Sequence, residues 1–175
     1  MRTNQIITAT NIIILLNLLM FGIQNMVEHG ILRFGLNIYF FEYELYYQLL
    51  SSMFVHSGTF HILMNMFVLY QFGSIIEEAI GVKRYLFIYF IGGVLTSVLS
   101  LVYMNVTGNW ANLVGASGAI SVLFGWYALR VPSERTAIII WIVLISFAPL
   151  FLGFPIAWYA HIIGFVLGWI IGYII

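Results

Sequence analysis

Residues 115–130 read GASGAISVLFGWYALR, and this stretch decides the class of fold. It is apolar enough to lie in lipid, yet it opens on a serine, Ser117, close to Gly115 and Gly118. Polar side chains inside a membrane are costly and point to function by default. The two glycines leave open space around the Ser117 hydroxyl. Ser117 is therefore the first candidate for chemistry in this chain.

The composition of the whole chain agrees with a lipid environment. Of its 175 residues, 63% are hydrophobic and 7% are charged, whereas a soluble domain averages about 45–50% apolar and about 25% charged residues. We therefore expect an all-α polytopic membrane protein that forms one domain over residues 1–175, with the lipid bilayer as its solvent. The absence of cysteine excludes disulfides and thiol catalysis. A net charge of zero without a basic patch argues against nucleic acid as a partner.

The distribution of apolar residues predicts six transmembrane helices, because a spanning helix needs about 20 such residues. The predicted spans cover residues 6–27, 59–79, 84–105, 115–130, 136–153 and 157–175. The first is long enough to span and lacks a small-residue cleavage site, so we interpret it as a retained helix and not as a signal peptide. The long connector 28–58 is rich in aromatic residues and is expected in the headgroup layer. An ordinary extramembrane loop is the alternative.

Basic residues predict the orientation of these helices. Most of them fall on one side of a six-helix protein, namely Arg2, Lys83, Arg84, Arg130 and Arg135. Only Arg33 falls on the other side. The positive-inside rule then gives cytoplasmic termini and an active site that opens to the outside. From the small size of the chain we expect a bacterial or archaeal inner (plasma) membrane.

Three helices carry polar residues at similar depth. His61 and Asn65 lie four residues apart in the second helix, Ser117 begins the fourth, and His161 lies near the start of the sixth. All three helices start on the same side. At about 1.5 Å of rise per residue, these groups lie roughly 5–10 Å below that surface. Water can reach groups at such a depth from outside.

Two helices carry a small residue at every fourth position, which favours close helix packing. These residues are Ala160, Gly164, Gly168 and Gly172 in the last helix, and Ser117, Ser121 and Gly125 in the fourth. His161 shares the face of Gly164 and Gly168. Contact between the two stripes would carry His161 toward Ser117, although generic packing is an alternative explanation for each stripe.

The polar residues predict a serine hydrolase. A serine hydroxyl needs a base within hydrogen-bond reach, and His161 can take its proton and return it to the leaving group. The chain contains no aspartate, so the prediction is a Ser–His dyad and not a triad. Candidate oxyanion donors are the Asn65 amide, a ring N–H of His61 and the backbone N–H of Ser117. The alternative is a metal bound by histidines, but His56 is the only apparent third ligand, so neither a metal nor a cofactor is expected.

These motifs resemble, in order and spacing, those of the rhomboid intramembrane serine proteases. Gly-Ala-Ser-Gly is similar to the family's Gly-x-Ser-Gly and implies that Ser117 is the nucleophile. Ala-His-Ile-Ile-Gly, which ends at Gly164, is similar to Ala-His-x-x-Gly and implies that His161 is the base. The pair His61 and Asn65 resembles the His-x-x-x-Asn motif on the oxyanion side.

The resemblance extends to two further residues and to the substrate. His56 is similar to a structural histidine where the connector packs on the core, and Glu77 to an acidic residue at the inner end of the second helix. The implied substrates are transmembrane proteins, cleaved in or next to their membrane segments. The implied lateral gate and cap are residues 136–153 and the loop after them, which includes Leu152, Phe154 and Pro155.

Two positions depart from the family pattern. Gln48 stands where the first loop usually carries the arginine of a Trp-Arg pair, which leaves the anchoring of that loop open. Ser121 stands where many members have an aromatic residue that stacks on the base histidine. The orientation of His161 therefore has no assigned cause: Ser121 could hydrogen-bond the ring, or another aromatic residue could replace the stack.

Two other functions compete with proteolysis. One is a non-catalytic rhomboid-like protein that binds membrane clients, for which Ser117 need not be reactive. The other is a small transporter, which internal repeats would favour. The sequence shows no such repeat.

Overall fold

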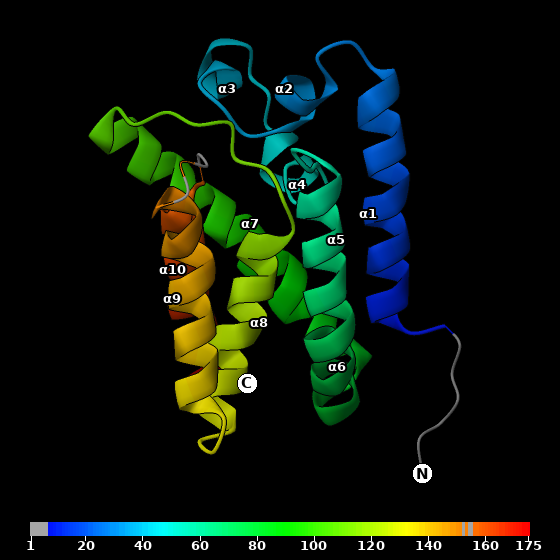
Figure 1. Cartoon of the computed structure of the whole chain (residues 1–175), viewed down its shortest axis with the longest axis vertical. Helices are drawn as coiled ribbons and strands as arrows, with labels where there is room; N and C mark the ends of the chain where they lie inside the picture. The colour runs from blue at the N-terminus through cyan, green and yellow to red at the C-terminus, as the bar shows by residue number, and fades with distance from the viewer. Residues whose placement is uncertain (1–6, 152, 154–155) are drawn as a thin grey trace.

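The computed structural model describes residues 7–151, 153 and 156–175, and it confirms the predicted all-α class for this part of the chain (Figure 1). The long helices are α1 (Ala9–Met26), α7 (Val82–Thr107), α8 (Ser117–Arg130), α9 (Arg135–Phe151) and α10 (Trp158–Ile174). Between α1 and α7, a further helix consists of α5 (Thr59–Val68), the π-helical η1 (Leu69–Gly73) and α6 (Ser74–Ile80). The connector contains the short helices α2 (Gly30–Phe34), α3 (Tyr39–Glu42) and α4 (Gln48–Ser51).

Every predicted span contains a helix, but length and hydropathy support fewer than six crossings. Three described helices are long and apolar enough to cross a membrane: α1 with 18 residues, Thr59–Ile80 with 22 and α7 with 26. The helices α9 and α10 have 17 residues each, and α8 has 14. Ile6 and Leu152, at the edges of predicted spans, lie outside the described residues.

The helix α8 begins two residues later than the sequence predicted. The helix begins at Ser117 and not at residue 115, well below α2 and α3 (Figure 1). Two backbone features just before Ser117 account for this start. Gly115 has φ +117°, outside the helical region and accessible mainly to glycine. Leu113 is held in an isolated bridge by mutual backbone hydrogen bonds with Leu36, with N···O distances of 2.7 and 3.0 Å.

The centre of the bundle is α8, in which every residue from Ala119 to Ala128 is buried. A helix that is buried on all sides belongs to the core. The helix α10 packs on it through glycines: a Cβ at Gly164 would lie 2.5 Å from the carbonyl oxygen of Gly118, and a Cβ at Gly168 would overlap that of Val122. In the same way, a Cβ at Gly125 of α8 would overlap the carbonyl oxygen of Phe165. The predicted contact between the two small-residue stripes is therefore confirmed.

Gln48 anchors the connector, although it stands where the family usually has an arginine. The side chain is fully buried, and its Nε2 donates to the backbone oxygens of Arg33 at 3.1 Å and Leu32 at 3.5 Å. Ser51 Oγ donates to the oxygen of Phe34 at 2.7 Å. These bonds tie α4 to α2. The exposed aromatic residues of this region are Tyr39, Phe41, Tyr43, Tyr46 and Tyr47, and their location in the headgroup layer stays a prediction.

Glu77 of α6 caps the start of α1. Its carboxylate accepts hydrogen bonds from the backbone N–H groups of Ala9 and Thr10, both at 2.8 Å, and from the Thr10 hydroxyl at 2.7 Å. The first N–H groups of a helix have no partner within the helix, and negative charge is favourable there. Since Glu77 is 67 residues from Thr10 along the chain, this cap fixes α1 against the rest of the bundle.

We expect Glu77→Gln to lower the free energy of unfolding by about 2 kcal/mol, because hydrogen bonds to a charged acceptor are lost and an amide N–H group then faces N–H donors. Thermal unfolding in detergent measures this loss. The control is Glu78→Gln, which removes the same charge from the adjacent, exposed residue and should change stability by less than about 0.5 kcal/mol. Equal effects of the two variants would contradict the capping role.

Candidate active site

Ser117 and His161 meet where α8 and α10 begin. Ser117 is the first residue of α8 and His161 the fourth of α10, and Ser117 Oγ lies 3.0 Å from His161 Nε2. The His161 ring is buried, whereas Ser117 is partly exposed. The glycine contacts let the two helices approach closely, and His161 precedes one of these glycines, Gly164, by one turn. This geometry allows the serine hydroxyl to donate to the ring nitrogen.

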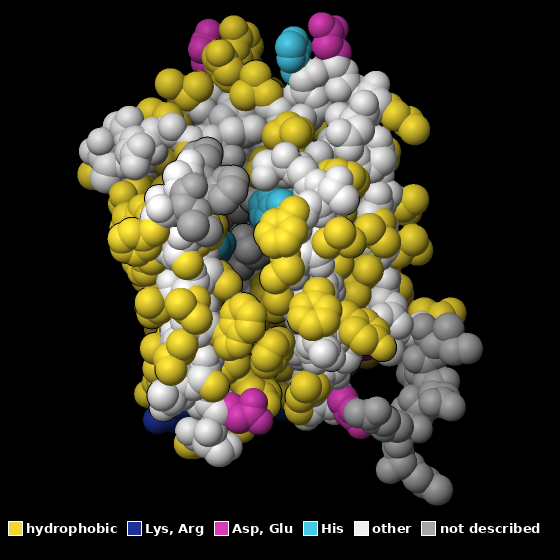
Figure 2. Space-filling model, viewed as in Figure 1, with side chains coloured by type: hydrophobic (Ala, Val, Ile, Leu, Met, Phe, Trp, Pro, Cys, Tyr) yellow, Lys and Arg dark blue, Asp and Glu magenta, His cyan; other side chains and the backbone are white. Residues whose placement is uncertain are grey.

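Both residues line a cavity of about 840 Å³. His61 and Asn65 of α5 line the same cavity. Its walls include apolar side chains of α5 and α9, among them Phe60, Met64, Trp141, Ile145 and Pro149. The space-filling view is hollowed in the upper part of the gap between these two helices, and histidine side chains are visible there (Figure 2). The cavity therefore brings four of the predicted site residues around one space.

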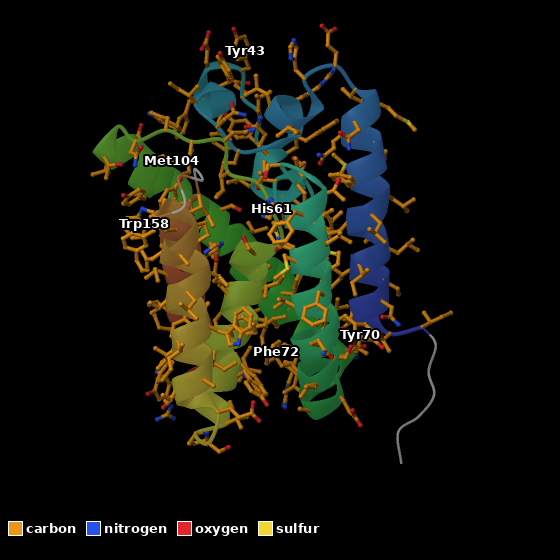
Figure 3. All side chains as sticks on the ribbon, viewed as in Figure 1. Tyr43, His61, Tyr70, Phe72, Met104 and Trp158 are labelled. Carbon is orange, nitrogen blue, oxygen red and sulfur yellow. The ribbon has the colours of Figure 1, made fainter. Side chains whose placement is uncertain are left out.

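His61 presents a ring N–H beside Ser117. Its Nδ1 accepts the backbone N–H of Ser57 at 3.4 Å and lies 3.0 Å from the Ser57 hydroxyl. A neutral imidazole with an accepting Nδ1 carries its hydrogen on Nε2. A Cβ at Gly115 would lie 2.8 Å from His61 Nε2 and 3.6 Å from Ser117 Oγ. The absent side chain of Gly115 thus leaves room between the His61 ring and the Ser117 hydroxyl, in the upper part of the bundle where Figure 3 labels His61.

Asn65 lies one helical turn further along α5. Its Nδ2 donates to the backbone oxygen of His61 at 2.9 Å, which fixes the orientation of the amide. The amide nitrogen has a second N–H, and Asn65 lines the cavity. Asn65 is therefore in a position to donate to a group bound there.

His56 lies behind the cavity and connects three parts of the chain. Gln24 of α1 pairs twice with its backbone: Gln24 Nε2 donates to the His56 oxygen at 2.6 Å, and the His56 N–H donates to Gln24 Oε1 at 2.9 Å. The ring Nδ1 lies 3.2 Å from the Phe54 oxygen, and Nε2 accepts from the N–H of Ala116 at 3.5 Å. These contacts hold the connector to the residue before Ser117.

Burial and, to a smaller extent, the neighbouring His61 lower the pKa of His56 to about 3. In the unfolded chain the pKa of histidine is about 6.5. Below that pH the unfolded state takes up a proton that the folded state does not, so stability falls as the pH decreases from about 6.5 toward 3.

We expect the loss of unfolding free energy between pH 7 and pH 5 to be about 2 kcal/mol smaller in His56→Gln than in the intact protein. Chemical or thermal unfolding in detergent at the two pH values measures this difference. His29→Gln is the matched control, because the His29 side chain is 79% exposed. An unchanged pH dependence in His56→Gln would show that His56 is not the buried neutral group described here.

The polar partner of the His161 ring differs from the one that the sequence suggested. Ser121 was one suggested partner, but its Oγ donates to the backbone oxygen of Ser117 at 2.7 Å, within α8, and not to the His161 ring. Ser146 of α9 was missed: its Oγ lies 3.4 Å from His161 Nδ1. Gln24 was missed as well. Ser146 and Gln24 are each a polar residue within a predicted apolar span, and this is the signal by which Ser117 was identified.

The helix that the resemblance assigned to a lateral gate forms one wall of the cavity. Its Phe147 ring packs on Trp158 at the start of α10, with 5.6 Å between ring centroids. Trp141 and Pro149 of α9 face the cavity. Leu152, Phe154 and Pro155, which were assigned to the gate and cap, lie outside the described residues.

Comparison with known proteins identifies the family. The family model of the Rhomboid domain matches residues 43–175. The chain belongs to the rhomboid family. Rhomboids are generally intramembrane serine proteases, and some rhomboid-like proteins are inactive. The matched region contains all of the motifs singled out above.

Individual rhomboids show the same relationship. The human presenilin-associated rhomboid-like protein, mitochondrial, is 35% identical over 91 residues, which are 52% of this chain and 24% of that protein. The zebrafish (Danio rerio) presenilin-associated rhomboid-like protein A, mitochondrial, is 32% identical over 67% of this chain and 30% of its own length. RHOMBOID-like protein 4 of Arabidopsis thaliana is 33% identical over 74% of this chain and 34% of its own length. The chain thus spans about a third or less of these rhomboids.

The same comparison corrects one expectation. The predicted localisation, a bacterial or archaeal plasma membrane with cytoplasmic termini, is wrong, because the rhomboids found are eukaryotic and several are named as mitochondrial. The small size of the chain does not indicate its source. The start of α1 and the end of α10 do lie at the same end of the bundle (Figure 1).

Proposed function

We propose that this rhomboid is an intramembrane serine endopeptidase that hydrolyses peptide bonds in or next to transmembrane segments of membrane proteins. The observation that carries the proposal is the 3.0 Å distance between Ser117 Oγ and His161 Nε2 at the wall of a cavity. In this proposal α1, Thr59–Ile80, α7, α8, α9 and α10 are the six membrane helices, and residues 1–175 form one domain. Family membership supports the class of reaction.

The proposed reaction runs through an acyl-enzyme. Ser117 Oγ attacks the scissile carbonyl carbon while its proton passes to His161 Nε2. The carbonyl oxygen becomes an oxyanion and accepts hydrogen bonds from His61 Nε2–H, Asn65 Nδ2–H and the backbone N–H of Ser117. The imidazolium then gives its proton to the leaving amine as the C–N bond breaks. Water attacks the ester with the same proton transfers, which releases the acid and regenerates Ser117.

Substrates would reach the cavity from the side, between α5 and α9, because these helices supply its apolar walls. The backbone carbonyls of a transmembrane helix are hydrogen-bonded within the helix. A substrate must therefore unwind before Ser117 can attack it. Substrates with glycine, proline or polar residues at that depth unwind at the lowest cost and are the class we expect.

The test combines a reactive probe with a model substrate. Purified protein in detergent or liposomes is incubated with a fluorophosphonate, and mass spectrometry identifies the labelled residue. We expect labelling of Ser117 and cleavage of a model transmembrane protein in or beside its membrane segment. Folded protein that neither reacts with the probe nor cleaves a panel of such substrates would overturn the proposal in favour of a non-catalytic protein that binds membrane clients.

A further inference from the structure

Ser146 is a fully buried hydroxyl in the apolar middle of α9, where a hydrophobic side chain would be expected. Burying a hydroxyl without a hydrogen bond costs free energy. Its Oγ lies 3.4 Å from Nδ1 of His161, the ring nitrogen that faces away from Ser117. The Ser146 hydroxyl therefore has its hydrogen-bond partner in the site and not in its own helix.

The chemistry of the ring assigns the direction of this hydrogen bond. A neutral imidazole carries one hydrogen, and a base that accepts the Ser117 proton at Nε2 must carry that hydrogen on Nδ1. An Nδ1–H needs an acceptor. Aspartate is absent from the chain, and the Ser121 hydroxyl is bonded to the backbone oxygen of Ser117. Among the described residues, Ser146 Oγ is the acceptor within reach of Nδ1.

We propose that Ser146 is a positioning residue: it accepts the Nδ1–H of His161 and so holds the ring in the tautomer and orientation that Ser117 requires. This inference rests on the proposed function of Ser117 and His161. A serine hydroxyl carries no charge, so it orients the ring but stabilises the imidazolium less than a carboxylate does. Because α9 supplies the acceptor, the correct tautomer depends on α9 being seated against α10.

The kinetic test compares variants that differ only in the hydroxyl. Ser146→Ala is expected to lower kcat about tenfold with KM unchanged, the scale of one neutral hydrogen bond. Ser146→Thr and Ser146→Val have the same shape, so any clash of the added methyl group affects both, and only the threonine variant keeps the hydroxyl. We expect a higher kcat for the threonine variant. Ser100→Ala, at a fully buried serine of α7 that does not line the cavity, should leave kcat unchanged.

A second measurement reads the tautomer directly and does not depend on activity. The ¹⁵N spectrum of histidine-labelled protein, with His161 assigned by its loss in His161→Ala, is expected to show a protonated Nδ1 and an unprotonated Nε2. In Ser146→Ala the signals should shift toward a mixture of the two tautomers. An unchanged tautomer together with a kcat within twofold of the intact protein would overturn the role of Ser146. If the intact protein is inactive toward probe and substrate, the proposed function fails, while the tautomer comparison still decides the contact.

Discussion

Ser117→Ala and His161→Ala are each expected to reduce the cleavage rate of a transmembrane substrate by on the order of 10⁴-fold or more, the size of effect seen when one member of a serine hydrolase unit is removed. The first variant removes the only hydroxyl within 3.0 Å of the His161 ring in the described structure. The second leaves Ser117 with no base. Single-turnover cleavage in liposomes measures both rates.

The double variant gives a sharper test of the dyad. If the two side chains act as one unit, removing both should cost about as much as removing either one, so the two effects should not multiply. Ser100→Ala controls for the loss of a buried serine as such. Cleavage that is as fast in all three variants as in the intact protein would come from a contaminating protease. Full activity of Ser117→Ala in the absence of a contaminant would exclude Ser117 as the nucleophile.

The residue types of the site could be predicted because each interrupts an apolar span. Ser117 and His161 could even be predicted to meet, since the repeat of small residues in α10 and α8 fixes which faces pack together. The start of α8 at Ser117 could not be predicted in the same way. It depends on the left-handed backbone of Gly115. It also depends on the bridge between Leu36 and Leu113, which links segments far apart in the sequence.

The supporting contacts were beyond prediction for the same physical reason. Ser146 reaches His161 from another helix, Gln24 pairs with His56 across 32 residues, and Glu77 caps a helix that begins 68 residues earlier. Spacing along one helix reveals which residues share a face, but it does not reveal which face of another helix comes opposite. A polar residue in an apolar span could be recognised as having a partner, while the identity of that partner required the packed structure.

Gly168→Ala is expected to have the largest effect on stability and to reduce activity as well. A Cβ at Gly168 would overlap the backbone oxygen of Val122 and lie 2.7 Å from its carbonyl carbon. Backbone atoms cannot move aside as a side-chain end can, so α10 must shift away from α8. Overpacking of this kind costs about 3 kcal/mol of unfolding free energy. His161 lies two turns earlier on α10, and a displacement of about 1 Å from Ser117 can lower the rate about 100-fold.

Gly172→Ala is the matched control for this prediction. It lies on the same face of α10, one turn further on, but its added Cβ would meet the end of the flexible Leu129 side chain, 2.8 Å from Cδ2. Both variants gain the same helix propensity, about 1 kcal/mol, so the difference between them reports packing alone. Unfolding in detergent and cleavage at a temperature where both variants are folded separate the two consequences. A destabilised Gly168→Ala that cleaves at the normal rate would show that the contact between α8 and α10 stabilises the bundle without setting the distance between Ser117 and His161.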